Sequence, residues 1–408
     1  MVASDMGWFG ALAMDLTSAW HQSVRLARAM ACLGALWMAG ACSEGERTVF
    51  APDLPSDVSL PADKAHVLRS TIRSPSFRIP AATDKADVCL DGSCQFTSLR
   101  AAFKAASDGD VITLAPGDYP SCLDMGDKSI ALVGRIAPSG ARARFTKACA
   151  RKAAFVSSAR KVLLQGLEIS GITVPDKNGA CVRLSGKGKR MRVALVDIVC
   201  TDSENGVLGS PGDGTVRIEG SHFLRNGGND GYAHGLYIDG GAEVLLKQSV
   251  IAGTKERGHS LKIGAKRLII ESSIVAGLTG SSSRTLDFYA GGTLVIKNSI
   301  LQQGPNADNN DMIAIGMEPL RAHEDATHLV WIEGSTLVFD DADRPRRLVF
   351  AGRALGPVRV ARSTLAGFTD TRIMPDAVAD VQIYAGRSEA GFVPFDGTLA
   401  TLPAQRRP

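Results

Sequence analysis

The fold is decided by three consecutive stretches that repeat one pattern: HGLYIDGGAEVLLKQSVIAG (residues 234–253), HSLKIGAKRLIIESSIVAG (259–277) and RTLDFYAGGTLVIKNSILQQG (284–304). Each stretch begins with a short apolar segment and continues with a second, β-branched segment. The starts, at positions 234, 259 and 284, are evenly spaced. A fixed period of this length, with several short strands per repeat, is typical of a solenoid, because a strand too short to bury a face alone pairs with its equivalent in the next coil.

The same pattern extends to both sides of these stretches. Equivalent five-residue segments begin at Ala180, Asn205 and Asp311, so that the spacing stays nearly constant along the chain. The third and fifth residues of each segment are mostly aliphatic or aromatic and should point inward, whereas the second and fourth should point outward. A serine also recurs after the second strand, and we interpret it as a turn or packing position. The six serines are Ser221, Ser249, Ser273, Ser299, Ser335 and Ser363.

A short amphipathic helix precedes the first coil, with its apolar residues on one face at helical spacing. These residues are Phe96, Leu99, Ala102, Phe103 and Ala106. We therefore predict an all-β protein, a right-handed parallel β-helix solenoid with a short N-terminal capping helix. The predicted regions are a signal peptide (1–41), a flexible tether (42–87), the β-helix (88–370) and a C-terminal cap and tail (371–408).

The N-terminus predicts export. Arg25 and Arg28 precede an apolar stretch, 29–41, that is too short for a transmembrane helix and has the flanks of a signal peptide. It ends in Ala-Gly-Ala before Cys42, which resembles a bacterial lipoprotein signal in which the cysteine is lipidated; plain secretion with cleavage nearby is the alternative. We expect a protein of the periplasm or outer membrane, or an extracellular one, attached to a membrane only through this lipid anchor.

Cysteine usage agrees with export. Six cysteines follow Cys42, and an even number in an oxidising compartment favours disulfides. They are Cys89, Cys94, Cys122, Cys149, Cys181 and Cys200. A Cys89–Cys94 bridge would close a short loop and a Cys181–Cys200 bridge would tie one coil, but the sequence leaves the pairing open. No CxxC pair is present to favour a metal site.

The charge balance bounds the possible ligands. The net charge is +4, from 46 basic and 42 acidic residues. This balance does not predict nucleic-acid binding, which usually requires a strongly basic face. Attraction for an anionic ligand must come from a local patch. We expect a monomer whose partner is an acidic polysaccharide.

A family resemblance rests on two parts of the chain. FTSLRAAFKAASDGD (96–110) and LAPGDY (114–119) resemble the capping helix and first coil of pectate-lyase-like right-handed β-helix proteins. The resemblance extends through the coil period over roughly residues 88–370. YAHGLYI (232–238) followed by GHSLK (258–262) is similar to a pattern of exported bacterial β-helix proteins. Because this fold hosts lyases, hydrolases, esterases, epimerases and phage adhesins, function must be argued from the site.

The repeat also superimposes polar side chains of the three central coils. The first and fourth residues of these coils form two columns, in which adjacent members should lie ~5 Å apart. The first column is His234, His259 and Arg284, and the second is Tyr237, Lys262 and Asp287. Acid–base groups, a carboxylate and a guanidinium on one surface are the reagents of a catalytic site. Taken singly, such residues are more often solvated surface or turn residues, but their clustering indicates a functional site.

Two loops should flank these columns, at residues 226–231 and 278–283. Loops on a rigid scaffold often supply the walls of a binding site. In or beside this region, the candidate substrate-binding residues are Asn229, Gln303, Asn309 and Glu318.

The leading hypothesis for the chemistry is β-elimination on a uronate-containing polysaccharide. This reaction needs a cation that neutralises the sugar carboxylate, a base for the C5 proton and an acid for the leaving oxygen. Arg284 is the candidate carboxylate clamp, because its planar guanidinium binds carboxylates in a bidentate manner. Lys262, His234 and His259 are candidate bases, and Tyr237 can serve as the acid or as the base. The sequence leaves the identity of the base open.

Two other functions stay open. Glycoside hydrolysis normally needs two carboxylates, which Asp287 with Asp311 or Glu318 would supply. A non-catalytic glycan-binding or scaffold lipoprotein would use the same surface only to bind. We expect no cofactor. Calcium-dependent pectate lyases use an acidic cluster on this sheet, where the columns here offer only Asp287, although Asn229 and Asp230 leave a calcium site open.

Overall fold

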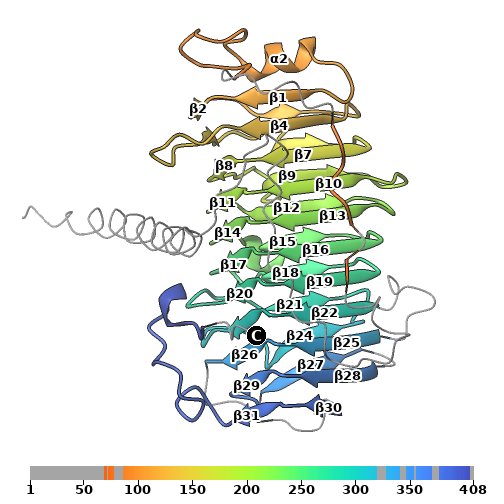
Figure 1. Ribbon diagram of the computed structural model, residues 1–408, viewed down its shortest axis with the longest axis vertical. Coiled ribbons are helices and arrows are strands. Elements are labelled where there is room, and N and C mark those ends of the chain that lie inside the picture. The colour runs from red at the N-terminus through yellow and green to blue at the C-terminus, as the bar shows by residue number, and fades with distance from the viewer. Residues whose placement is uncertain are drawn as a thin grey trace, which may run out of the picture. The chain divides into compact units, whose positions relative to one another are not determined.

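The computed structural model describes the β-helix and parts of the segments on either side of it (Figure 1). The described residues are 69–70, 72–77, 86–318, 328–340, 346–352, 355–369 and 376–404. The predicted signal peptide and Cys42 lie outside these ranges. No helix within them is long and apolar enough to cross a membrane.

The strands form three parallel sheets, and most coils contribute a strand to each sheet in turn (Figure 1). Neighbouring strands within a sheet come from successive coils, so their backbone hydrogen bonds run along the stack of coils. The predicted all-β solenoid is confirmed. We call the three sheets A, B and C.

Sheet A contains the described strands β1 (Val111–Leu114), β4 (Ile130–Gly134), β7 (Lys161–Gln165), β10 (Arg192–Val196), β13 (Thr215–Glu219), β16 (Glu243–Lys247), β19 (Arg267–Glu271), β22 (Thr293–Lys297), β25 (His328–Glu333), β28 (Leu355–Ala361) and β30 (Asp376–Ala379). Sheet B contains β2 (Gly117–Tyr119), β5 (Ala143–Phe145), β8 (Leu167–Ser170), β11 (Val199–Thr201), β14 (His222–Leu224), β17 (Val250–Ala252), β20 (Ile274–Ala276), β23 (Ile300–Gln303), β26 (Thr336–Phe339), β29 (Thr364–Ala366) and β31 (Gln382–Tyr384). Sheet C contains β3 (Leu123–Asp124), β6 (Ala153–Ser157), β9 (Ala180–Ser185), β12 (Asn205–Ser210), β15 (Leu236–Ile238), β18 (Leu261–Ile263), β21 (Leu286–Phe288), β24 (Asp311–Ile315) and β27 (Arg347–Ala351).

The interior of the coils follows the predicted alternation only in part. The third and fifth residues of the repeat point into the core, as Leu261 and Ile263 do in β18. The second residue was expected to point outward, but Ser260 and Thr285 are 0% and 1% exposed. Each of these two residues precedes the first residue of its strand, so the two-residue alternation of a strand does not reach it. The expectation for the second position is therefore wrong.

Helix α2 (Leu99–Ala105) covers the first coil at the N-terminal end of the β-helix (Figure 1). It begins at Ser98, whose side chain accepts a hydrogen bond from the backbone N–H of Ala101 at 3.2 Å. Leu99 and Ala102 are buried, and Phe103 packs against the same core. The predicted capping helix is confirmed.

The serine column has the structural role that was expected. The Oγ of Ser249 accepts a hydrogen bond from the backbone N–H of Ser221 at 3.1 Å and donates one to the carbonyl of Lys247 at 2.7 Å. The same N–H to Oγ bond links each serine to the next as far as Ser363. The column therefore satisfies backbone donors that are buried at successive turns.

The six cysteines that follow Cys42 all form disulfides. The pairs are Cys89–Cys94, Cys122–Cys149 and Cys181–Cys200. The first and third are the two pairings that were considered from the sequence. The second joins turns of two successive coils near the N-terminal end. Three disulfides are consistent with an exported protein, because such bonds persist in oxidising compartments.

Residues 69–70 and 72–77, which we call the strap, belong to the predicted tether but lie across sheet A (orange in Figure 1). Ile72 is 8% exposed and packs on outward side chains of four strands. These side chains are Leu245, Ile269, Val295 and Trp331. Strap carbonyls accept side-chain hydrogen bonds from three sheet A strands. The donors are Arg267 to Arg69, Arg217 to Ile72 and Lys161 to Ser76.

The C-terminal segment that follows β31 also packs on the β-helix. Arg387 donates two hydrogen bonds to the carboxylate of Asp340, at 2.6 and 2.7 Å, and both side chains are less than a tenth exposed. Further along, Phe395 and Leu402 pack against outward residues of sheet B, among them Ala276. This part of the predicted tail is therefore folded onto the solenoid.

Candidate functional site

The second predicted column lies on sheet C. Tyr237, Lys262 and Asp287 pair in register on β15, β18 and β21. The Nζ of Lys262 lies 3.7 Å from Oδ2 of Asp287. The alignment expected from the even spacing of the coils is therefore present, and residues distant in sequence contact one another across coils.

The two histidines of the first column stack on each other. Their ring centroids are 5.3 Å apart and their planes differ by 6°. The Nδ1 of His234 accepts a hydrogen bond from the backbone N–H of His259 at 3.1 Å, which assigns the proton of a neutral His234 to Nε2. Burial, assisted by the charge of Lys262, lowers the pKa of His234 to about 3. His234 is thus a neutral ring, 3% exposed, that helps to position His259.

His259 and Asp287 each hold a buried polar atom that has no hydrogen-bond partner among the described residues, Nδ1 and Oδ1 respectively. Their other polar atoms face each other, with Nε2 of His259 3.4 Å from Oδ2 of Asp287. Burial, together with the neighbouring His234 and the charges of Lys262 and Arg284, holds the pKa of His259 well below its usual range. Burial also raises the pKa of Asp287 to about 6, although Lys262 and Arg284 act in the opposite direction. Unsatisfied buried groups with displaced pKa values are typical of functional sites.

Lys262 lies at the centre of the site. Its Nζ is 3.0 Å from Oε1 of Glu318 and also faces Asp287. The same ammonium group lies over two aromatic rings, 5.6 Å from the centroid of Tyr237 and 5.3 Å from that of Tyr289. Two carboxylates and two ring faces surround this ammonium group and hold it in place. Lys262 is therefore a fixed cation of this surface.

The guanidinium of Arg284 is partly engaged within the protein. Its Nε donates a hydrogen bond to Oδ2 of Asp311, a carboxyl that is 4% exposed. Nη2 of Arg347 lies 3.7 Å from the other oxygen of Asp311. One carboxylate thus orients two arginines, and the terminal nitrogens of Arg284 are the ones left to bind a ligand.

Two residues of this surface were missed in the sequence. Arg347 opens the segment RLVFA (347–351) and pairs in register with Asp311, so it occupies the first position of another coil. The segment fits the repeat, but the turns between Asp311 and Arg347 are longer than those between the earlier coils, which hides it. Tyr289, which donates a hydrogen bond to Asp239, has no counterpart in the repeat, so no pattern pointed to it.

The predicted substrate-binding residues do not share one location. Glu318 lies beside Lys262, as described above. Gln303 is 0% exposed: its amide nitrogen donates to the carbonyls of Asn309 and Asp311, and its oxygen accepts from the N–H and hydroxyl of Thr285. This placement corrects the expectation for Gln303, since a side chain that is saturated inside the coil cannot reach a bound glycan.

Asn309 and Asn229 lie in the loops that lead into sheet C. The side-chain nitrogen of Asn309 donates to Oγ of Ser283 at 2.7 Å, so it fastens two loops of successive coils to each other. Asn229 begins a 3₁₀ turn (Asn229–Gly231) ahead of the histidine column and is partly exposed. Of the four candidates, Glu318 and Asn229 are therefore the better placed for a ligand.

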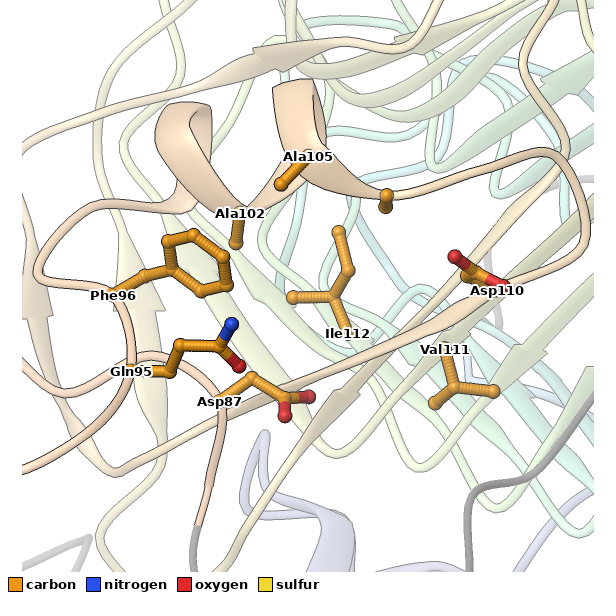
Figure 2. Close-up of a pocket in the computed structure, with 9 residues that line it drawn as sticks. Asp87, Gln95, Phe96, Ala102, Ala105, Asp110, Val111 and Ile112 are labelled. Carbon is orange, nitrogen blue, oxygen red and sulfur yellow. The ribbon is translucent and has the colours of Figure 1, made fainter.

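A pocket detected elsewhere in the structure is not this site. It lies under helix α2 at the N-terminal end (Figure 2). Its lining residues are Asp87, Gln95, Phe96, Ala102, Ala105, Ala106, Asp110, Val111 and Ile112. The lining is mostly apolar and contains no histidine, lysine or arginine, so it offers few reagents. Among the described residues, no group of three or more His, Cys, Asp or Glu side chains is arranged to hold a metal ion.

Comparisons with known proteins agree with this architecture. No protein-family model matches the sequence, and no curated protein matches it either. The structure is similar to that of pectate lyase Pel9A, with a TM-score of 0.52 and 14% identity over 82% of this chain and 87% of that one. An alginate lyase from Paenibacillus sp. str. FPU-7 matches with a TM-score of 0.47 and 17% identity, over 71% of this chain and 95% of that one. At these identities the likeness shows the fold alone: the chain is a parallel β-helix of the pectate-lyase-like type.

Proposed function

We propose that this protein is an exported polysaccharide lyase that cleaves a uronate-containing glycan by β-elimination at the Tyr237–Lys262–Asp287 column. The observation that carries the proposal is the contact of His259 with Asp287 beside the fixed cation Lys262. This arrangement holds a base, a carboxylate and a cation within one surface, which is the set that elimination requires. The solved structure of Pel9A, which shares the fold, is by its title that of a pectate lyase, and it favours the same class of activity.

The contacts argue against two of the candidate bases, His234 and Lys262. The lone pair of His234 on Nδ1 is already used by the N–H of His259, and its other nitrogen carries the proton. The Nζ of Lys262 is engaged in ion pairs with Glu318 and Asp287. His259 is neutral at pH 7, because burial and neighbouring charges lower its pKa. We therefore propose the imidazole of His259 as the base.

The proposed step balances as follows. The imidazole of His259 takes the C5 proton, and the terminal nitrogens of Arg284 together with Lys262 neutralise the uronate carboxylate, over which the negative charge spreads. The C4–O bond then breaks as the C4–C5 double bond forms, and the leaving oxygen takes the phenolic proton of Tyr237. Asp287, which is ionised above its pKa of about 6, stabilises the imidazolium that forms 3.4 Å away. Later proton exchange with solvent restores both side chains.

Glycoside hydrolysis is the second candidate, and one observation favours it. Asp287, whose pKa is raised to about 6, keeps a larger protonated fraction near neutral pH than an ordinary aspartate, as a general acid must. Of the two candidate second carboxylates, Asp311 is bound by two arginines and Glu318 lies 3.0 Å from the ammonium of Lys262, which makes each a poor base or nucleophile. Elimination uses the cations as well as the acids, so we place hydrolysis second.

Ultraviolet absorbance distinguishes these functions, because only elimination creates an unsaturated uronate. Purified protein is assayed against alginate, polygalacturonate and other uronate polysaccharides, with reducing ends measured in parallel. We expect the absorbance to rise with one of these polymers. The rate of this rise should be roughly 10²- to 10⁴-fold lower for His259→Gln and for Tyr237→Phe. The control is His222→Gln, which removes a half-buried histidine on sheet B.

Other outcomes would replace the proposal. New reducing ends without absorbance would establish a hydrolase, and binding without either signal would establish a glycan-binding protein. An unchanged rate in His259→Gln would remove the base assignment. The proposed roles need no organic cofactor, and we expect activity to survive chelation of divalent cations. Loss of activity on chelation, restored by calcium, would instead place an ion in the site.

A further inference from the structure

Sheet C carries a third cation besides Lys262 and Arg347, and it lies outside the site described above. Arg183 is the fourth residue of its coil, in β9, and pairs in register with Leu208 of β12, which in turn pairs with Tyr237. Arg183 therefore lies in the same column as the proposed site, two coils away, a distance of ~10 Å.

Arg183 differs from the other two cations in the described strands of this sheet. Lys262 has Glu318 at 3.0 Å, and Arg347 has Asp311 at 3.7 Å. No carboxylate oxygen of the described residues lies within 4.0 Å of Arg183, whose one hydrogen bond, to the carbonyl of Asn178, is long at 3.4 Å.

The surroundings of Arg183 also raise the free energy of its charge. The side chain is half-buried, and this burial lowers the pKa of its guanidinium. Asp176 acts in the opposite direction, but its carboxylate is paired with Lys152 at 3.1 Å. A half-desolvated guanidinium without a carboxylate partner is favourable for binding an anion, because the ligand replaces lost hydration with charge-assisted hydrogen bonds.

The surface between Arg183 and Tyr237 is apolar. Leu208 is 7% exposed and forms a small outward cluster with Ala153 and Ala180, against which Tyr237 packs. Such a floor suits the apolar face of a sugar ring. On the other side of the site, by contrast, the column continues with Ala314 and Phe350, and Arg347 covers the latter ring at 4.4 Å.

We propose that Arg183 forms a subsite that binds the carboxylate of a second uronate, on the same glycan chain as the sugar at Tyr237 and Lys262. The inference rests on the proposed function for its substrate class. An extended glycan that lies along the stack of coils would cross Leu208, and the sugar at Arg183 would be removed by roughly two residues from the reacting one. The enzyme would then favour longer acidic chains that extend toward the N-terminal coils.

The test is binding as a function of chain length. Titration calorimetry is carried out with oligogalacturonates and oligomannuronates from two to six sugars, on wild-type protein, Arg183→Gln and the control Arg192→Gln. Arg192 belongs to the same coil but lies exposed on sheet A, in β10. We expect Arg183→Gln to weaken the longest oligomers roughly 10- to 100-fold and to leave the disaccharide unchanged. Arg192→Gln should bind every length as the wild type does.

The outcomes separate this subsite from the proposed reaction. A length-dependent loss in a protein that shows no turnover would support the subsite and remove the lyase. Turnover with equal binding of all lengths by Arg183→Gln and wild type would overturn the subsite alone. An equal loss at every length would also overturn it, since that result indicates general damage to the surface. Absence of any binding to acidic oligomers by the wild type would overturn both.

Discussion

Substitution of Asp287 by asparagine should make the protein more stable while inactivating it. The Asp287 side chain is 7% exposed, and its Oδ1 has no hydrogen-bond partner among the described residues. Burial raises its pKa from the usual 3.8 to about 6. The folded protein therefore binds this proton more tightly than the unfolded chain does. One pKa unit corresponds to about 1.4 kcal/mol, so the ionised carboxylate lowers the free energy of unfolding by about 3 kcal/mol at pH 7.

The sign of the pH dependence follows from the direction of the shift. Since the folded pKa is the higher one, the stabilising contribution of Asp287 is complete below pH 4 and is lost as the pH rises from about 4 to 6. Asparagine cannot ionise, so Asp287→Asn should exceed the wild type by about 1–3 kcal/mol above pH 6.5 and match it near pH 4. The lower end of this range allows for the lost attraction between Asp287 and Lys262; Lys262 still pairs with Glu318 in the variant.

Urea unfolding at a series of pH values measures this difference. The buried histidines His234 and His259 destabilise both proteins as the pH falls below 6.5, because their folded pKa values are lowered, and most of this effect cancels in the comparison. The control is Asp311→Asn, which leaves two arginines without their carboxylate and should destabilise by on the order of 3 kcal/mol. If Asp287→Asn lowers the free energy of unfolding equally at pH 4 and pH 8, the ionised carboxylate does not destabilise the folded protein and the reasoning fails.

Three further predictions concern the scaffold and the pH profile. The activity kcat/KM should fall as the pH drops through about 6, where Asp287 becomes protonated and ceases to support His259; a profile that is flat from pH 5 to 8 would contradict this role. Ile72→Ala, which truncates the buried contact of the strap, should lower stability by about 2 kcal/mol and increase proteolysis near the strap, whereas unchanged melting and cleavage would mean that the strap is not bound. Arg387→Met leaves the buried carboxylate of Asp340 without its guanidinium and should destabilise by about 3 kcal/mol in thermal melting, more than loss of an exposed pair would; a shift no larger than that of an exposed pair would contradict the buried contact.

The repeat determined how much of the fold was predictable. The alignment of His234 with His259 and of Tyr237 with Lys262 was visible in the sequence because these coils are evenly spaced, so equivalent residues recur at a fixed interval. Where the turns lengthen, the pattern is lost, as at Arg347. The burial of Gln303 depends on where strand β23 ends, which the alternation alone does not fix.

The chemistry of the site was only partly accessible from the sequence. The residue types of the two columns indicated acid–base work, but the choice of base needed contacts. His234 is a poor candidate for the base because its Nδ1 accepts a backbone hydrogen bond from His259. Lys262 is a poor candidate because it pairs with the carboxylate of Glu318, which lies two coils further along the chain. The pKa values of these groups depend on burial, which a sequence pattern does not contain.

The strap gives the solenoid a mechanical property. The hydrogen bonds from sheet A side chains to its carbonyls begin at Arg69, beside β19, and end at Ser76, beside β7. The strap therefore meets sheet A at the middle of the stack and runs toward the first coil. A force applied through the residues ahead of Arg69 would load these contacts along their length, in shear, rather than open them one by one. The coils that carry His259 and Asp287 would then bear tension at the stack's middle, while helix α2 and the first coil stay unloaded until the strap gives way.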